Sequence, residues 1–281
     1  MERLAQLQAR IHAVDELGEI LSAIRSLAAA RQQQARGVLP GMEAYAETLR
    51  VAIGQALTLT SHEGSPRPGQ LTGREVWIGF GAEHGFVGGF SSRLVSRLAR
   101  SGPETERWIV GTRTAALAPE HGVEPSWRCA LTTRPSGILH TATEIADALL
   151  ARIGRGEIQR VRMVYALNKA GSVALCVEDL FPLDLAKIPP SSAPRPLITL
   201  HPELLLQKLA DEYLAAILAN AVAHALAAEN LARLEATRRA TDQIQDRLEA
   251  LHRRERSLRQ EEVTTELLDV INGVEALRSR G

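Results

Sequence analysis

Apolar residues recur at steps of three and four along two long segments, one at each end of the chain. The carboxy-terminal segment, from Glu203 to Asn272, contains no Gly and no Pro. Pro202 stands where a first-turn proline is tolerated, and Gly273 stands where a helix commonly stops. One helix over this run would extend about 105 Å, too long for the inside of a globule. The narrow stripe predicts a coiled-coil seam made of Leu231, Leu234, Thr237, Thr241, Ile244, Leu248, Leu251, Val263, Leu267, Val270, Val274 and Leu277.

The amino-terminal segment has the same spacing, which predicts a helix over Leu4–Arg36. Gly and Pro residues within Gly37–Gly41 interrupt the pattern, so a separate, shorter helix is expected over Met42–Leu59. Residues 1–60 and 200–281 are therefore predicted to form the two arms of a long antiparallel two-helix coiled coil.

The middle of the chain, residues 74–187, has a different pattern. Turn-forming residues bound it at Ser61–Gly73 and at Ile188–Pro196. Between them, short apolar runs alternate with helical patterns, which favours a Rossmann-like α/β domain inserted between the two arms. The fold class is thus α/β plus coiled coil. The expected strands are Val76–Phe80, Trp108–Val110, Val161–Leu167 and Val173–Val177, and the expected helices are Ser91–Arg100 and Ile138–Ile153.

Composition narrows the classes of function. The formal net charge of the 281 residues is zero, which gives no whole-molecule attraction to nucleic acid or anionic membranes. Cys129 and Cys176 have no CxxC or His spacing, so they are expected to be buried and reduced rather than ligands of zinc or halves of a disulfide. We expect no apolar run of the ~18 residues that span a bilayer and no signal peptide, hence a soluble, cytoplasmic protein.

A glycine-rich loop, GFGAEHGFVGG at Gly79–Gly89, follows a predicted strand and precedes a predicted helix. Loops in this context bind phosphate at helix amino termini, but this one lacks the Lys-Ser/Thr of a P-loop and the GxGxxG spacing. We therefore expect Gly85, Gly88 and Gly89 to permit a tight turn and close backbone packing. Glu83 and His84 are neighbours on this loop without a further catalytic partner, and no cofactor or metal site is expected.

Three separated groups of residues follow, in order, the pattern of one known family. At the amino terminus they are RIHAV at residues 10–14, Ile20, Ala23 and SLAAAR at residues 26–31. In the middle the segment is GFVGGF at residues 85–90, with Phe86 and Val87 in place of leucine and cysteine. Near the end they are Glu229, Arg233, Ala236, Ala240, Thr241, Arg259, Gln260, Val263, Thr264, Glu266, Leu267, Gly273, Ala276 and Leu277. Over nearly its whole length the chain resembles, as a divergent member, the gamma subunit of F-type ATP synthases.

That resemblance implies a central rotor shaft. Both long helices would thread a hexamer of alpha and beta subunits, and the α/β domain would contact the epsilon subunit and the membrane ring of c subunits. Rotation would couple ion flow to ATP synthesis or hydrolysis, with the catalytic residues on beta and none on this non-catalytic chain. The subunit would be peripheral, on the cytoplasmic side of the bacterial inner membrane, without binding nucleic acid. The implied partner contacts are Arg10, Ile11, Ile20, Ala23, Glu229, Arg233, Arg259, Gln260 and Thr264, with Arg259 and Gln260 as the main polar grip on a beta-subunit loop.

Two other classes of protein fit parts of the pattern. One is a coiled-coil scaffold that carries a small-molecule-binding α/β domain. The other is an enzyme that uses the glycine loop, in which case a phosphate compound should raise the melting temperature of the isolated chain.

Overall fold

The computed structural model describes residues 2–59, 73–169, 172–183, 188 and 197–278. The predicted linkers at Ser61–Gly73 and Ile188–Pro196 lie almost entirely outside these residues. The chain divides into two compact units: unit 1 comprises Met1–Leu27 and Glu235–Gly281, and unit 2 comprises Ala28–Leu234. Each unit is described by itself.

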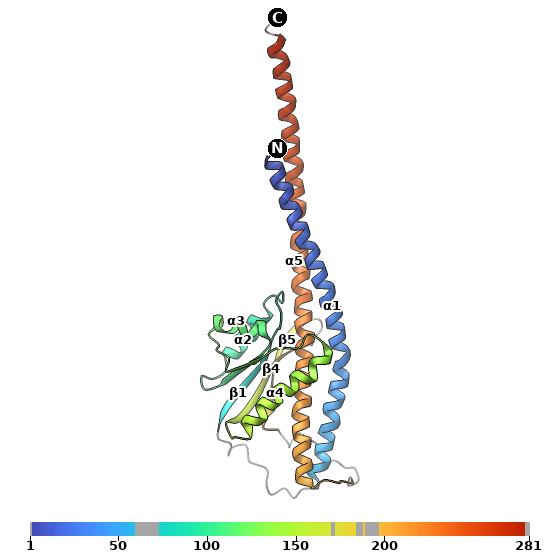
Figure 1. Ribbon diagram of the computed structural model, residues 1–281, viewed down its shortest axis with the longest axis vertical. Coiled ribbons are helices and arrows are strands. Elements are labelled where there is room, and N and C mark those ends of the chain that lie inside the picture. The colour runs from blue at the N-terminus through green and yellow to red at the C-terminus, as the bar shows by residue number, and fades with distance from the viewer. Residues whose placement is uncertain (1, 60–72, 170–171, 184–187, 189–196, 279–281) are drawn as a thin grey trace. The chain divides into compact units, whose positions relative to one another are not determined.

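The amino-terminal helix α1 spans Glu2–Leu57 without a break, with Pro40 in its interior (Figure 1). The predicted division into two helices was therefore wrong. An interior proline removes a backbone hydrogen bond and costs about 3 kcal/mol. Within unit 2, Val38, Leu39 and Met42 pack against the main hydrophobic core on both sides of this position. Tertiary packing thus offsets the local penalty.

The carboxy-terminal helix α5 spans Pro202–Arg278, so a single helix from Pro202 is confirmed. It continues through Gly273, where the sequence predicted its end. Among the described residues, α5 also contains a window of 18 residues that is long and apolar enough to cross a membrane, contrary to our expectation. Because 78% of that window is buried inside the protein, its apolar character is that of a core helix.

The sheet of unit 2 has five strands in the order β3-β2-β1-β4-β5. All neighbouring strands are parallel except β4 and β5, which form an antiparallel pair. The strands are β1 (Arg74–Phe80), β2 (Glu106–Val110), β3 (Trp127–Cys129), β4 (Ile158–Lys169) and β5 (Ser172–Phe181). Four of them were predicted with shorter bounds, and β3 was missed because three residues are too few for a periodic pattern.

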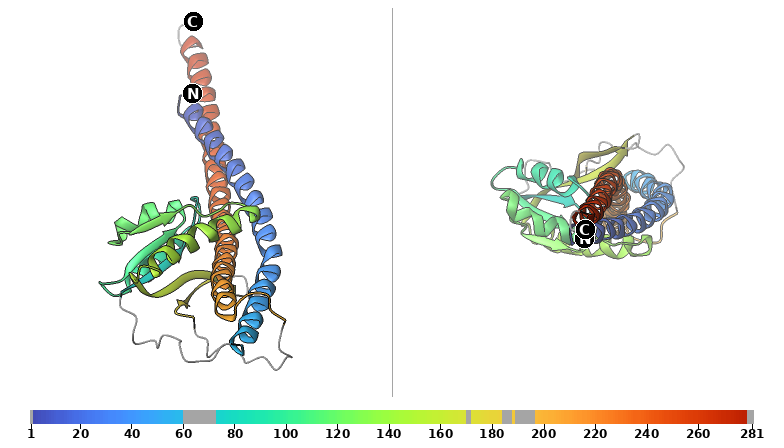
Figure 2. Two further views of the ribbon diagram at one scale, coloured as in Figure 1. Left: turned by 60° about the horizontal axis from the view of Figure 1, so that its bottom comes forward. Right: turned by 90° about the horizontal axis from the view of Figure 1, so that it is seen from above.

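Helices cover both faces of this sheet (Figures 1 and 2). They are α2 (Phe90–Ala99), α3 (Thr112–Leu117) and α4 (Ile138–Ile153), with 3-10 turns at Ala118–His121 and Pro135–Gly137. Successive strand residues face opposite sides. Trp77 accordingly packs with α2 and α3, whereas its neighbour Ile78 belongs to the core that contains α4 and α5.

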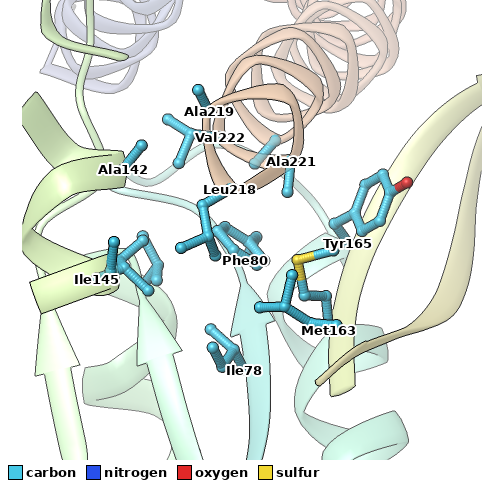
Figure 3. Close-up of a cluster of buried hydrophobic side chains, with 14 of the residues drawn as sticks. Ile78, Phe80, Ala142, Ile145, Met163, Tyr165, Leu218, Ala219, Ala221 and Val222 are labelled. Atoms are coloured by element: carbon cyan, nitrogen blue, oxygen red, sulfur yellow. The ribbon is translucent and has the colours of Figure 1, made fainter. Parts of the chain in front are cut away.

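The larger core of unit 2 is formed by the sheet and by parts of three helices, α1, α4 and α5. Figure 3 shows Ile78 and Phe80 of β1 and Met163 of β4 directed toward Ile145 of α4 and Leu218 of α5. Ala219 and Ala221 of α5 are buried in this core as well (Figure 3). Helix α5 is thereby part of the core of the α/β domain.

Unit 1 consists of parts of α1 and α5 alone. Gln8 Nε2 donates a hydrogen bond to Glu255 Oε1 at 3.0 Å. A Cβ atom added at Gly18 would lie 3.4 Å from Ile244 Cγ2, an ordinary van der Waals contact. An alanine would therefore fit at this position, and the contact between the two helices does not require glycine here.

The two cysteines are free and half-buried rather than fully buried. Burial raises the pKa of the Cys129 thiol to about 12. Cys176 Sγ donates a weak hydrogen bond to the carbonyl oxygen of Tyr165 at 3.3 Å, and burial raises its pKa as well. Both thiols are therefore protonated and unreactive at neutral pH.

Candidate functional site: the loop after β1 and helix α5

Glycines at the end of β1 permit the close packing that the sequence predicted for the loop, but at different positions. An added Cβ at Gly79 would lie 2.6 Å from Leu98 Cδ1, and one at Gly81 would lie 2.3 Å from Thr114 Oγ1. At Gly85 and Gly89 an added Cβ would meet nothing within 4 Å. Gly88 has a left-handed backbone, with φ of 54°. Of the three glycines singled out from the sequence, Gly88 is the one whose conformation favours glycine.

Glu83, which follows β1, forms hydrogen bonds with residues that follow β2 and β3. Its carboxylate accepts hydrogen bonds from Thr112 N at 2.9 Å, Thr112 Oγ1 at 2.7 Å and Leu131 N at 2.8 Å. Glu83 follows β1, Thr112 follows β2 and Leu131 follows β3, so all three lie at the carboxyl edge of the sheet. This carboxylate thus accepts hydrogen bonds from backbone and hydroxyl donors of two neighbouring loops.

Two charged residues of α5, Glu229 and Arg233, hold the next part of the loop. The Glu229 carboxylate accepts hydrogen bonds from the backbone N–H of Glu83 at 3.0 Å and of His84 at 3.2 Å. The Arg233 guanidinium donates to the carbonyl oxygens of Gly85 at 3.1 Å and His84 at 3.3 Å. We call this set of four side-chain to backbone contacts the clasp.

The two side chains that form the clasp, Glu229 and Arg233, are also an ion pair, and both are buried. Arg233 also donates to Glu229, one helical turn earlier, and to Asn230 Oδ1 at 3.1 Å. The side chains of Arg233 and Glu229 are 8% and 3% exposed. Burying a charge is costly unless it is paired and hydrogen-bonded. Here the two charges satisfy each other and four polar groups of the loop.

Apolar contacts surround the clasp. Val87 and Phe90 are buried against Ala228 and Leu231 of α5. Between these buried positions and the clasp, Phe86 has a positive φ of 60°, which is uncommon for an aromatic residue, and its side chain is 63% exposed. The loop therefore has a fixed backbone and one exposed aromatic side chain.

The sequence contains a signal for the clasp that the periodic pattern alone did not bring out. Glu229 and Arg233 are four residues apart, on adjacent turns, at the end of the alanine-rich stretch of α5. Two opposite charges at this spacing beside a buried stretch indicate an internal ion pair. The side chains of Glu229 and Arg233 bind the loop of the same chain. Any contribution that they make to a partner contact is therefore made through that loop.

The other residues proposed to contact partners belong to unit 1. Arg10, Ile20 and Ala23 on α1 are exposed, and Ile11 is half-buried. On α5, Arg259 is 62% exposed and donates to Glu255 Oε1 at 3.0 Å. Gln260 and Thr264 are exposed too, and the Thr264 hydroxyl donates to the Gln260 carbonyl oxygen at 2.8 Å.

A histidine occupies the junction of α1, α5, β4 and β5 in unit 2. His224 Nε2 lies 3.8 Å from Glu43 Oε1, and the imidazole lies 5.7 Å from the ring of Tyr165. Burial lowers the pKa of His224, although the carboxylates of Glu43 and Glu178 act in the opposite direction. His224 is consequently neutral at neutral pH.

Comparison with known proteins shows that nearly the whole chain matches one family. A family model described as ATP synthase matches residues 3–277. The chain is 28% identical to the ATP synthase gamma chain of Streptomyces griseus, with 95% of this chain and 94% of the relative covered. It is 26% identical to the ATP synthase gamma chain of Bacteroides thetaiotaomicron, with 97% and 99% covered.

Solved structures show the same fold. The similarity to a chain of the Euglena gracilis mitochondrial ATP synthase, in a structure of OSCP, F1 and c-ring, has a TM-score of 0.70 at 13% identity and covers 99% of this chain and 95% of that chain. A chain in the rotor structure of the same enzyme gives 0.65 at 12% identity, with 93% and 99% covered.

Proposed function

We propose, because this chain belongs to the ATP synthase family, that it is the gamma subunit, the central-stalk rotor of an F-type ATP synthase. Rotation of this shaft inside a hexamer of alpha and beta subunits couples ion flow through the membrane ring to ATP synthesis or hydrolysis. The observation that carries the proposal is the extent of the match, because the family model spans residues 3–277 and so includes both long helices and the α/β domain.

The role proposed for this chain is mechanical and non-catalytic. Gamma subunits form the stalk, and the catalytic residues of the complex lie on beta. A helix of 77 residues that is continuous through the core of the α/β domain suits the transmission of torque. The clasp and the core bind this helix to the sheet, which supports rotation of unit 2 as one body.

We further propose that residues 1–60 and 200–281 pair as a long antiparallel coiled coil, with residues 74–187 as the inserted α/β domain. Within unit 1, Gln8 contacts Glu255 and Gly18 faces Ile244, so residue numbers rise along one helix as they fall along the other. Within unit 2, Glu43 lies near His224 and Tyr45 Oη donates to Glu212 Oε1 at 2.6 Å, so there too residue numbers rise along one helix as they fall along the other.

The partners proposed for this chain are the alpha and beta subunits, the epsilon subunit and the c ring, at the cytoplasmic side of the bacterial inner membrane. Exposed apolar side chains near the end of α5 support an enclosing partner, since they lie in water in the isolated chain. They are Val263, Leu267, Leu268, Val270, Ile271 and Val274. Arg10, Ile11, Ile20, Ala23, Arg259, Gln260 and Thr264 supply further contacts in unit 1, and Glu229 and Arg233 contribute through the loop they hold.

Reconstitution tests this proposal directly. The full chain is co-expressed with the alpha and beta subunits of its own complex, and the purified assembly is examined for stoichiometry and ATPase activity. We expect one copy per alpha–beta hexamer, turnover that depends on this chain, and no ATP hydrolysis by the chain alone. A chain that does not co-purify with the hexamer, as expected of a scaffold protein, contradicts the proposal.

A further inference from the structure

The clasp lies where open α/β sheets commonly bind their ligands. Strand β1 has β2 on one side and β4 on the other, and its crossover helix α2 packs on the opposite face from α4. The point between β1 and β4 is thus a topological switch point, outside whose carboxyl end α/β proteins bind ligands. The loop at residues 81–89 begins at this place.

The polar groups at this position are those of an anion site. Consecutive backbone N–H groups that converge on one point, together with a guanidinium group, suit the two oxygens of a carboxylate or the oxygens of a phosphate. Here the N–H groups of Glu83 and His84 and the guanidinium of Arg233 converge on the two carboxylate oxygens of Glu229. The anion is part of the protein.

We infer that the loop after β1 is an oxyanion-binding site whose ligand is the Glu229 carboxylate, supplied by α5 of the same chain. Glu229 therefore has two effects. It attaches α5 to the edge of the sheet, and it occupies the donors that a free carboxylate or phosphate would need. The inference rests on contacts within unit 2 and stands whether or not the chain is a rotor subunit.

Burial makes the loss of this carboxylate costly. In Glu229→Ala, the buried guanidinium of Arg233 loses the one carboxylate that it contacts here, and the N–H groups of Glu83 and His84 lose their acceptor. Removing one member of a buried ion pair is strongly destabilising, and for a chain of this size we expect the melting temperature to fall by about 6–20 °C. A free anion that takes the place of the carboxylate restores both sets of contacts.

The test is chemical rescue of the full chain. Melting temperatures are measured in chloride, formate and inorganic phosphate at matched ionic strength and constant pH. We expect formate to raise the melting temperature of Glu229→Ala by about 3–6 °C at ten times its dissociation constant. Phosphate should raise it less, because the space left by one carboxylate is small. The wild-type protein shows the general effect of each salt, and rescue is the rise in melting temperature of Glu229→Ala beyond that of the wild type.

Two controls separate binding from a general salt effect. Glu249→Ala removes an exposed member of an Arg pair on the same helix, and it should respond to anions as the wild type does. The double variant Glu229→Ala, Arg233→Ala lacks the guanidinium, so formate should not rescue it. Equal stabilisation of the wild type, or of the double variant, overturns the inference.

If Glu229→Ala does not fold in chloride, refolding yield from urea replaces the melting temperature. A higher yield in formate than in chloride, seen for Glu229→Ala and not for the double variant, supports an anion site. Equal yields in the two salts contradict it.

Discussion

Two Glu–Arg pairs on the same helix differ in almost everything except their spacing. Glu229 and Arg233 are 3% and 8% exposed within unit 2, whereas Glu249 and Arg253, also four residues apart, are 64% and 65% exposed within unit 1. The first pair binds four backbone groups of a distant loop. The second has an N–O separation of 3.8 Å and water around it. The i, i+4 spacing is thus the same signal in both places, and burial decides how much each pair contributes to stability.

The largest expected effect comes from breaking the buried pair. Arg233→Ala leaves the Glu229 carboxylate buried and uncompensated, and the free energy of unfolding should fall by about 3–5 kcal/mol. Arg253→Ala, the matched change in the exposed pair, should cost at most about 1 kcal/mol. Urea unfolding of the two full-length variants measures both values. Equal losses would show that burial does not distinguish the pairs.

The glycine loop allows a second comparison, between Gly88 and Gly89. Gly88→Val forces a β-branched residue into a left-handed backbone and should destabilise unit 2 by about 1–2 kcal/mol. Gly89, with φ of −79° and open space around an added Cβ, is the control. It is the N-cap of α2, where valine is disfavoured, so valine should cost up to about 1 kcal/mol there. We expect ATP to leave the melting temperature of the wild-type chain unchanged, and the same is expected of both variants. A larger loss for Gly89→Val contradicts the assignment.

A half-buried and an exposed histidine extend the comparison to pH. The pKa of His224 is lowered in the folded state by burial, so the folded chain binds fewer protons than the unfolded chain. Stability should therefore fall as pH decreases from above about 6.5 toward the folded pKa, by less than about 1.4 kcal/mol per pH unit. In His224→Gln this loss should be absent.

His252, with a side chain 54% exposed in unit 1, is the matched control for that change. Chemical unfolding between pH 5 and 7.5 measures the slope for the wild type and for both variants. Loss of the pH dependence in His252→Gln rather than in His224→Gln would contradict the assignment to the half-buried residue.

The smallest effect on stability, and the most specific effect on turnover, is expected for Arg259 and Gln260. Both side chains are exposed, so the double alanine variant should unfold within about 0.5 kcal/mol of the wild type. If they grip a beta-subunit loop, coupled turnover should slow while assembly is retained, since one hydrogen bond to a charged group contributes about 1.5–3 kcal/mol. Steady-state ATPase of the reassembled complex is compared with that of the Arg253→Ala, Arg254→Ala variant. Equal activities argue against the grip.

Periodic patterns in the sequence predicted the elements that depend on neighbouring residues. The helix at Ile138–Ile153 has the predicted bounds, and four of the five strands were located. Family resemblance, carried by short groups of residues spread over the chain, predicted the relationship that the family model confirms. Local spacing is sufficient for these elements because the apolar face of each is encoded within its own segment.

Other features of the fold depend on residues far apart in the sequence. Pro40 remains inside α1 because Val38, Leu39 and Met42 pack against the core, a contact that the local pattern does not contain. The three-residue strand β3 exists because β2 offers it hydrogen bonds.

For the candidate site, the residue types can be read directly from the chain: a glycine-rich loop after a strand, and a Glu and an Arg one helical turn apart. That the N–H groups of Glu83 and His84 should bind Glu229 is a contact across some 145 residues. It depends on the position of α5 against the carboxyl edge of the sheet, which removes water from both partners. The sequence shows which residues carry hydrogen-bonding groups. Only the packing of distant segments determines which of these groups are buried together.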